Sequence, residues 1–275
     1  MTAIPRALNR ATEQLGRVSD TPRLDAELLM AHALGIGRDR LIIDNPRGET
    51  PQTFFGFIER RMAAEPVAYI TGRRDFWTVD LEVGPGALVP RPDSETLISA
   101  AVEHFSGTSG PLRILDLGAG PGTLLLAALD EWPKATGLGV DASEAALAYA
   151  ARNAERLSLA ARAELRLGNW AEGITDRFDL ILCNPPYVAT EADLGPGVAE
   201  FEPSEALFAG PEGLDAYRAL APQLPQLLAN GGLAAVEIGM DQADSVAGLL
   251  ATGGLSAKVA PDLGGRPRAV LLTWV

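Results

Sequence analysis

Cysteine and histidine are scarce in this chain, whose 275 residues include one cysteine, Cys183, and two histidines. A single cysteine excludes an internal disulfide framework, and with only two histidines beside it no Cys/His metal cluster can be assembled. Long apolar runs are also missing, since none approaches the roughly 18 to 20 residues that cross a bilayer. Residues 1–16 lack the apolar centre of a signal peptide. We therefore expect a cytoplasmic protein with no metal site.

Positive charge is in short supply as well. Lysine and arginine number 23 against 36 aspartates and glutamates, which gives a net charge of −13. A field of this sign repels nucleic acid on average. The basic pairs at Arg60–Arg61 and Arg73–Arg74 are short and are expected on solvated faces. We expect a monomer that contacts neither nucleic acid nor membrane.

Residues 1–75 have the pattern of a small helical domain. The segments 21–36 and 50–65 each place a proline near the start and repeat apolar residues at helical spacing. From residue 76 to residue 93 the pattern changes to alternation typical of strands, around the turn Gly84–Gly86. We expect this segment to be a β-hairpin that links two domains.

Residues 94–275 alternate strand-like and helix-like segments. Apolar strands joined by amphipathic helices predict an α/β domain, doubly wound, with a mostly parallel sheet covered on both faces. Ligands bind such sheets at the carboxyl ends of the strands. The expected strands are 113–118, 136–141, 163–168, 178–183, 232–239 and 268–275.

The first of these strands runs into a glycine-rich turn. Gly118, Gly120 and Gly122 precede a helix, so the backbone can take positive φ, a ligand can approach closely, and the helix offers free N–H groups. The spacing is G-x-G-x-G, with Asp116 two residues earlier, and differs from the G-x-G-x-x-G of dinucleotide sites. This spacing suits a ligand without a pyrophosphate.

Polar side chains also end the next two strands. Asp141 ends the second strand, where a carboxylate can accept both hydroxyls of a ribose; the alternative is that Asp141 only caps the following helix. Asn169 and Trp170 follow the third strand, and an amide with an indole could hold a purine; Trp170 could instead fill the core. Together with the glycine turn, these residues predict a nucleoside ligand.

The fourth strand ends in Asn184-Pro185-Pro186-Tyr187. The prolines lack N–H groups, so the carbonyls around them stay available as acceptors beside the Asn184 side-chain oxygen. Two neutral acceptors at this spacing match a planar –NH2 group, and the Tyr187 ring can pack on it. We expect these residues to hold an amino group for alkylation.

From about residue 90 onward the chain resembles the class I S-adenosylmethionine-dependent methyltransferases, which implies a seven-stranded sheet with an antiparallel last strand. NPPY occurs in methyltransferases of adenine and cytosine amino groups and in those of protein glutamine. The segments "PVAYITGRRDFW", "LVPRPDSE", "FEPSEALFAGPEGLDAYR" and "GGRPRAV" together resemble the bacterial peptide chain release factor glutamine methyltransferases. This resemblance covers nearly the whole chain, including its helical front end.

The resemblance implies that the protein methylates the glutamine of the Gly-Gly-Gln tripeptide in class 1 release factors and forms S-adenosylhomocysteine. It implies that Asn184 and the Pro185 carbonyl accept the amide hydrogens, that Pro186 and Tyr187 complete the substrate site, and that residues 1–75 with the hairpin contact the release factor. The residues that it assigns to the cofactor are Gly118, Ala119, Gly120, Pro121 and Gly122 for the methionine part, Asp141 for the ribose, Asn169 and Trp170 for the adenine end, and Asn184.

Some positions depart from the family pattern or keep two interpretations. Ala119 and Pro121 stand where a hydroxyl residue is usual, and Asn169 stands where an acid is common. Arg91, Asp93 and Glu95 either shape the pocket or, for Asp93, cap the next helix, and Glu202 lies either at the substrate entrance or in an ion pair. The alternative functions are glutamine methylation of a ribosomal protein, methylation of nucleic-acid amino groups, and cofactor binding without catalysis.

Overall fold

The computed structural model describes residues 3–275, which form two compact units. The smaller unit comprises the chain up to Arg73 together with Leu194–Glu202, and the larger unit comprises Arg74–Asp193 and Pro203–Val275. Within the described residues, no helix combines the length and the apolarity needed to cross a membrane.

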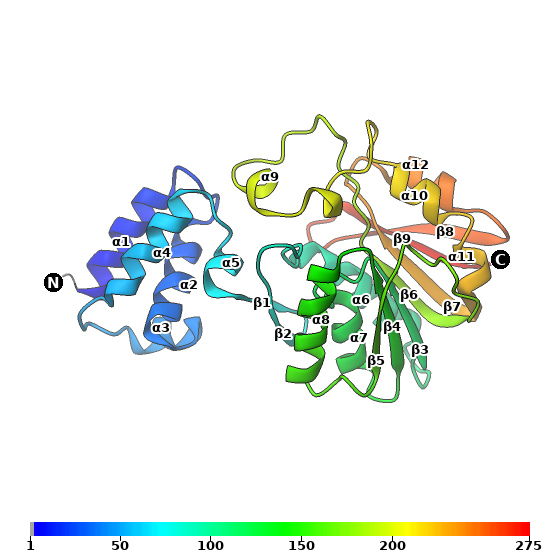
Figure 1. The fold of residues 1–275 in the computed structure, drawn as a ribbon, viewed down its shortest axis with the longest axis horizontal. Helices are drawn as coiled ribbons and strands as arrows, with labels where there is room; N and C mark the ends of the chain where they lie inside the picture. The colour runs from blue at the N-terminus through cyan, green and yellow to red at the C-terminus, as the bar shows by residue number, and fades with distance from the viewer. Residues whose placement is uncertain (1–2) are drawn as a thin grey trace. The chain divides into compact units, whose positions relative to one another are not determined.

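The smaller unit is a helical bundle (Figure 1). Leu15, Leu29 and Phe54 come from three different helices and are fully or almost fully buried in its core. An ion pair of 2.8 Å between Arg61 and Asp25 joins two of these helices at its edge. The helices predicted at 21–36 and 50–65 are confirmed. The helices are α1 (Ile4–Leu15), α2 (Pro22–Leu34), α3 (Arg38–Asp44), α4 (Gln52–Met62), α5 (Val67–Thr71) and, from the second segment, α9 (Val198–Phe201).

The larger unit is built on a seven-stranded sheet with the order β5-β4-β3-β6-β7-β9-β8. Only β9 runs antiparallel to its two neighbours, so the prediction of a mostly parallel sheet is confirmed. The sequence pattern did not identify β8, because this edge strand has one buried residue, Leu255, and carries few large apolar side chains. The strands are β3 (Arg113–Leu117), β4 (Thr136–Asp141), β5 (Ala163–Leu167), β6 (Phe178–Cys183), β7 (Leu228–Glu237), β8 (Leu255–Pro261) and β9 (Pro267–Trp274).

Helices cover both faces of this sheet (Figure 1). On one face lie α6 (Glu95–His104), α7 (Thr123–Glu131) and α8 (Glu144–Arg156). On the other lie α10 (Asp215–Leu220), α11 (Leu224–Leu227) and α12 (Ala243–Leu250). Residues 214–228 have a helical pattern but form two short helices, α10 and α11. Pro222 and Pro225 interrupt it, because a proline has no N–H for the helix ladder.

A β-hairpin precedes this sheet in the chain, but its turn is not where the sequence predicts it. Strands β1 (Arg73–Phe76) and β2 (Val79–Glu82) are joined through Trp77, whose φ is +52°. Two-residue hairpin turns need positive φ, which favours glycine. Trp77 occupies this position while Glu95 Oε1 accepts its backbone N–H at 3.0 Å. Gly84–Gly86 lies after β2 and forms a separate turn.

Candidate active site

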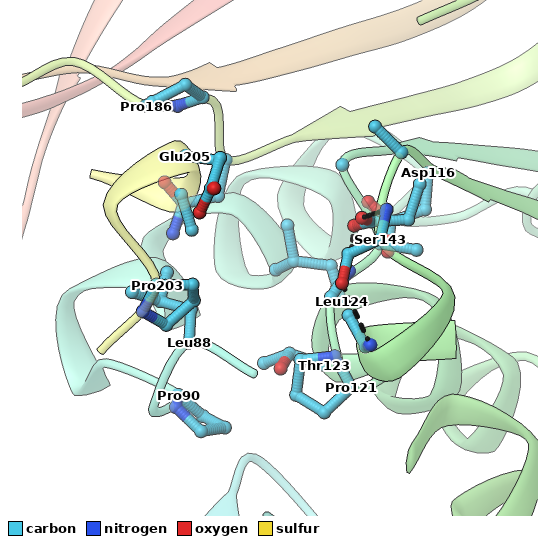
Figure 2. Close-up of a pocket in the computed structure, with 18 of the residues that line it drawn as sticks. Leu88, Pro90, Asp116, Pro121, Thr123, Leu124, Ser143, Pro186, Pro203 and Glu205 are labelled. Carbon is cyan, nitrogen blue, oxygen red and sulfur yellow. Dashed lines mark hydrogen bonds between the residues drawn. The ribbon is translucent and has the colours of Figure 1, made fainter. Parts of the chain in front are cut away.

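A cavity of about 590 Å³ lies at the carboxyl ends of β3, β4, β5 and β6. Its position agrees with the rule for ligands of doubly wound sheets. Figure 2 shows Asp116 and Ser143 at one side of this cavity and Pro186, Pro203 and Glu205 at the other. The predicted site residues that line it are Gly118, Ala119, Gly120, Pro121, Asp141, Asn169, Trp170, Asn184 and Pro186. Gly122, Pro185 and Tyr187 are next to lining residues in the sequence, but they do not line the cavity themselves.

The glycine turn between β3 and α7 is bent as its sequence requires. The φ angles of Gly118, Gly120 and Gly122 are +77°, +56° and +86°, in the left-handed region that favours glycine. A Cβ on Gly122 would come within 2.8 Å of the Leu126 side chain, whereas a Cβ on Gly120 would meet nothing within 4 Å. The turn therefore packs against α7 on one side and leaves open space on the other, where a ligand can approach the backbone.

Asp141 ties this turn to the end of β4. Its Oδ2 accepts the Gly120 N–H at 2.7 Å, and its Oδ1 accepts the Ser143 N–H at 2.8 Å. The helix cap is Ser143, whose hydroxyl accepts the Ala146 N–H, so the capping alternative for Asp141 is wrong. Each carboxylate oxygen keeps a second lone pair. Asp141 can thus orient the glycine turn and still accept hydroxyl groups from a ligand.

Asp116 is a cavity residue that the sequence pattern marked only by its spacing from the glycines. It is fully buried, and its Oδ2 accepts the Leu125 N–H at 2.9 Å. Its Oδ1 has no hydrogen-bond partner among residues 3–275. Burial, with a smaller contribution from the charge of Asp141, raises the pKa of Asp116 to about 7. A buried carboxyl group with an unused oxygen favours a cationic ligand, because a positive charge would offset the cost of burial.

Trp170 serves both interpretations that the sequence left open. It lines the cavity, and it also packs against the hydrophobic cluster between the sheet and α10–α12. Its backbone has a φ of +51°, which is uncommon for a bulky residue. Asn169 lines the cavity beside it. The two residues form an apolar and an amide surface at the end of β5.

The NPPY segment presents one oriented amide to the cavity. Asn184 Nδ2 donates to Ser94 Oγ at 3.0 Å. Its Oδ1 accepts no hydrogen bond within the described chain and is left as the group that a ligand can use. Tyr187 is held away from the cavity, since its hydroxyl donates to Glu237 Oε1 at 3.2 Å and its carbonyl accepts from Gln242 Nε2 at 3.0 Å. Packing of the Tyr187 ring on a substrate stays a prediction.

Glu237, at the end of β7, is a buried carboxyl group that sequence reasoning missed. Its Oε1 accepts the Tyr187 hydroxyl, and its Oε2 has no hydrogen-bond partner among residues 3–275. Burial raises the pKa of Glu237 to about 7, although its hydrogen bonds and the nearby Arg268 guanidinium oppose the rise. Burial and the charge of Glu237 also raise the pKa of Tyr187. Glu237 lies behind the NPPY segment and does not line the cavity.

The structure places each of the four residues whose roles the sequence left open. Asp93 pairs with Arg268 Nη2 at 3.0 Å, and the helix that follows has no side-chain cap, so Asp93 does not cap it. Arg91 lines the cavity. Glu95 binds the turn of the hairpin, as described above. Glu202 is buried and belongs to the smaller unit.

Strand order, glycine turn and the acid at the end of β4 together define a class I S-adenosylmethionine-dependent methyltransferase. Solved structures share this fold. A methyltransferase from Pyrococcus furiosus aligns with a TM-score of 0.52 at 20% identity, over 71% of this chain and 88% of its own. The 16S rRNA N2 G1207 methyltransferase of Thermus thermophilus, solved with AdoMet and guanosine, aligns with a TM-score of 0.51 at 21% identity, over 74% of this chain and 50% of its own.

Sequence comparison identifies the family within this class of methyltransferases. Residues 6–72 match the PrmC N-terminal domain, and residues 94–200 match the methyltransferase small domain. The release factor glutamine methyltransferase of Rhodospirillum rubrum is 46% identical over 92% of this chain and 79% of its own. That of Cereibacter sphaeroides is 42% identical over 98% and 94%. The chain belongs to the release factor glutamine methyltransferase family, and its cofactor is S-adenosylmethionine.

The site fits this cofactor. S-adenosylmethionine carries a sulfonium and an ammonium group, which match the unpaired oxygen of Asp116, and a ribose, which matches Asp141. Open space beside Gly120 leaves its backbone accessible. No group of three or more histidine, cysteine, aspartate or glutamate side chains in residues 3–275 is arranged to hold a metal ion.

Proposed function

We propose that this protein transfers a methyl group from S-adenosylmethionine to the side-chain amide nitrogen of the glutamine in the Gly-Gly-Gln tripeptide of class 1 release factors. The observation that carries the proposal is the orientation of Asn184. Its Nδ2 is engaged by Ser94, so the oxygen end is the one available at the cavity. An acceptor at this place suits an –NH2 substrate and not a carbonyl.

The proposed chemistry needs positioning more than it needs a base. S-adenosylmethionine supplies a methyl group on a positively charged sulfur. An amide nitrogen is a poor nucleophile because its lone pair is delocalised. Acceptance of its two hydrogens by Asn184 Oδ1 and the Pro185 carbonyl would return electron density to nitrogen and fix its direction, an effect worth several kcal/mol in well-ordered sites. The nitrogen gains the methyl group and loses one proton to water.

We propose for the cofactor the residues that the family resemblance implies, which their places at the cavity support. The turn Gly118–Gly122 would face the methionine part, Asp141 the ribose, and Asn169 with Trp170 the adenine. Asn184 stands between this part of the cavity and the substrate. We add Asp116, whose unused oxygen would offset the positive charge of the cofactor. Pro186, which lines the cavity, would border the glutamine.

Substrate recognition away from the reacting amide is assigned to residues 1–75 and to the hairpin β1–β2, with residues 94–275 as the catalytic domain. The match of residues 6–72 to the PrmC N-terminal domain supports this assignment. We further propose that the protein acts as a monomer in the cytoplasm, where class 1 release factors work. The net charge of −13 is consistent with a protein substrate in preference to nucleic acid.

One experiment tests the function against its rivals. The purified protein is incubated with S-adenosylmethionine labelled in the methyl group and, separately, with a class 1 release factor, its glutamine-to-alanine variant, ribosomal proteins and DNA. Label on the wild-type release factor alone is expected. Label on a ribosomal protein or on DNA would contradict the proposal and select a rival. Absence of label in every reaction, with cofactor still bound, would support a binding module without catalysis.

A further inference from the structure

Asn153 of α8 is a fully buried side chain that does not line the cavity. Its Oδ1 accepts the Glu82 N–H at 2.7 Å. Its Nδ2 donates to the Glu82 carbonyl at 3.0 Å and to the Pro121 carbonyl at 2.9 Å. One side chain therefore joins three parts of the larger unit: helix α8, the end of β2, and the glycine turn between β3 and α7.

Glu82 decides which end of the Asn153 amide faces Pro121. The two ends of an amide have nearly the same shape and can exchange by a half turn. The Glu82 N–H can only donate and the Glu82 carbonyl can only accept, so a reversed amide would meet both groups with the wrong end. The backbone of β2 thus sets the Asn153 side chain as a donor to the glycine turn.

The face of α8 that carries Asn153 packs against the same turn. Ala146, Ala150 and Asn153 lie three or four positions apart and share one face of the helix. Ala146 lines the cavity, and a Cβ on Gly122 would lie 3.4 Å from the Ala150 Cβ. The glycine turn is therefore held from α8 by packing at Ala150 and by a hydrogen bond at Asn153.

This hydrogen bond turns the Pro121 carbonyl away from the cavity. Pro121 lines the cavity (Figure 2), whereas Asn153, toward which its carbonyl points, does not. Thr123 and Leu124 also line it and begin α7, and their N–H groups have no acceptor within residues 3–275. Free N–H groups at a helix start favour an anion, and a carbonyl oxygen turned in beside them would repel it. The methionine part of S-adenosylmethionine ends in such an anion, a carboxylate.

We propose that Asn153 is a positioning residue that holds the Pro121 carbonyl and so keeps the glycine turn in the conformation that receives the methionine carboxylate of the cofactor. The inference rests on the proposed function in one respect, the assignment of Gly118–Gly122 to the methionine part. The Gly122 N–H of the same peptide group donates to the Ala119 carbonyl at 2.9 Å, so two hydrogen bonds hold this peptide. Without the bond from Asn153 only one remains, and the peptide can turn its carbonyl into the cavity. The apparent Kd of the cofactor then rises in proportion as the competent conformation becomes rarer.

The test separates the methionine part of the ligand from its nucleoside part. Asn153→Ala and Asn153→Asp are compared with wild type in the Kd of S-adenosylhomocysteine and of 5′-methylthioadenosine, which keeps the sulfur, ribose and adenine but has no carboxylate. Asn153→Asp keeps the size of the side chain and the acceptor for the Glu82 N–H, but it offers at most one hydrogen to two carbonyls. The Kd of S-adenosylhomocysteine should rise by about tenfold in Asn153→Ala, the value of one hydrogen bond, and by less in Asn153→Asp. The Kd of 5′-methylthioadenosine should not change.

Two further variants serve as controls. Arg152→Ala removes the neighbouring ion pair between α8 and the Glu82 carboxylate and leaves the Pro121 carbonyl bound. Asn230→Asp makes the same chemical change as Asn153→Asp at an exposed position. Both controls should bind the two ligands as wild type does. Thermal unfolding of each variant records its loss of stability separately from its loss of affinity.

Equal losses of affinity for both ligands would overturn the inference, because Asn153 would then only support the fold. An unchanged Kd of S-adenosylhomocysteine in folded Asn153→Ala would overturn it as well. If neither variant folds, NMR of the wild type decides, since a hydrogen bond that favours a ligand is favoured by that ligand to the same extent. The Asn153 side-chain N–H hydrogens should exchange more slowly at saturation with S-adenosylhomocysteine than at saturation with 5′-methylthioadenosine, and equal rates would contradict the inference.

Failure of this inference and failure of the proposed function are distinguishable. None of these measurements uses a release factor, so the results for Asn153 do not depend on which substrate is methylated. A wild-type protein that binds S-adenosylhomocysteine no more tightly than 5′-methylthioadenosine would remove the glycine turn from the methionine part of the cofactor, and would overturn that assignment together with the inference.

Discussion

The two sides of the cavity are built by different means. The cofactor wall, formed by Gly118–Gly122 and Asp141, uses backbone N–H groups and one carboxylate from consecutive elements of the chain. The acceptor wall, formed by Asn184 and by Ser94, whose hydroxyl oxygen accepts the Asn184 Nδ2–H, uses side chains from two distant segments. A wall made of backbone tolerates changes in most side chains. A wall made of connected side chains loses the orientation of its acceptor when any one of these side chains is replaced.

The largest effect is expected from Asn184→Ala, which removes the acceptor but leaves the cofactor wall intact. We expect kcat to fall by about 10²–10³-fold, as when one preorganised group is lost at a reacting centre. The Kd of S-adenosylhomocysteine, measured by calorimetry, should rise much less. Asn169→Ala is the matched control, since it removes another amide from the same cavity and should affect the KM of the cofactor more than kcat. Equal losses of kcat and cofactor affinity in Asn184→Ala would show that Asn184 mainly holds the cofactor.

Asp141→Ala should break the cofactor wall instead. The variant loses the acceptor for the Gly120 and Ser143 N–H groups and for the ribose. Hydrogen bonds to a charged group contribute about 1.5–3 kcal/mol each, so we expect the Kd of S-adenosylhomocysteine to rise by about 10–100-fold. Asp176→Ala, which removes an exposed carboxylate paired with Arg113, serves as the control and should bind normally. An unchanged affinity in Asp141→Ala would remove this residue from the cofactor site.

Gly122→Ala tests how far the cofactor wall depends on close backbone packing. The new Cβ would lie 2.8 Å from the Leu126 side chain at a φ of +86°. We expect unfolding to become easier by about 2–4 kcal/mol, the sum of left-handed strain and overpacking. Gly173→Ala has a φ of +74° with no atom within 4 Å of its Cβ, so it should show only the strain. Chemical denaturation measures both. Equal losses in the two variants would mean that the contact with α7 contributes nothing.

A smaller, pH-dependent effect is expected from Asp116→Asn. Below about pH 4 Asp116 is protonated in both the folded and the unfolded state. Between its ordinary pKa of 3.8 and its folded value of about 7, only the unfolded state releases the proton, so the wild type loses stability as the pH rises through this window. The loss should be on the order of 1 kcal/mol, because water and relaxation soften the cost of burial. The stability of Asp116→Asn relative to wild type should rise over the same window and then level off; parallel curves would contradict the assignment.

The sequence predicts that the glycine turn, Asp141 and Asn184 come together at one cavity, because each follows a strand of the parallel sheet. The glycine spacing, the acid at the end of β4 and the NPPY segment each follow a strand directly, and parallel strands bring their carboxyl ends together. Ser94 and Glu237 could not be found in this way. Ser94 lies 90 positions from Asn184, and nothing in its neighbourhood marks it as a partner of that amide. Only the folded sheet brings these side chains together.

The errors in the predicted fold have local causes. The sequence predicts the hairpin turn at Gly84–Gly86 because glycine is the usual turn residue. Trp77 makes the turn instead, and Glu95 and Glu131 accept its two N–H groups. These carboxylates come from α6 and α7, so the compensation for an unfavourable turn residue is tertiary. The sequence does not predict strand β8, because an edge strand needs few large apolar side chains.

The position of β9 in the sheet has a consequence for how the protein folds. β9 follows β7 and β8 in the chain but lies between them in the sheet. Until residues 267–274 have been made and inserted, β7 presents an open edge and β8 has no neighbour. Arg268 reaches Asp93 only then. During synthesis, the open edge of β7 and the unpaired β8 are therefore exposed to wrong pairing until β9 is inserted.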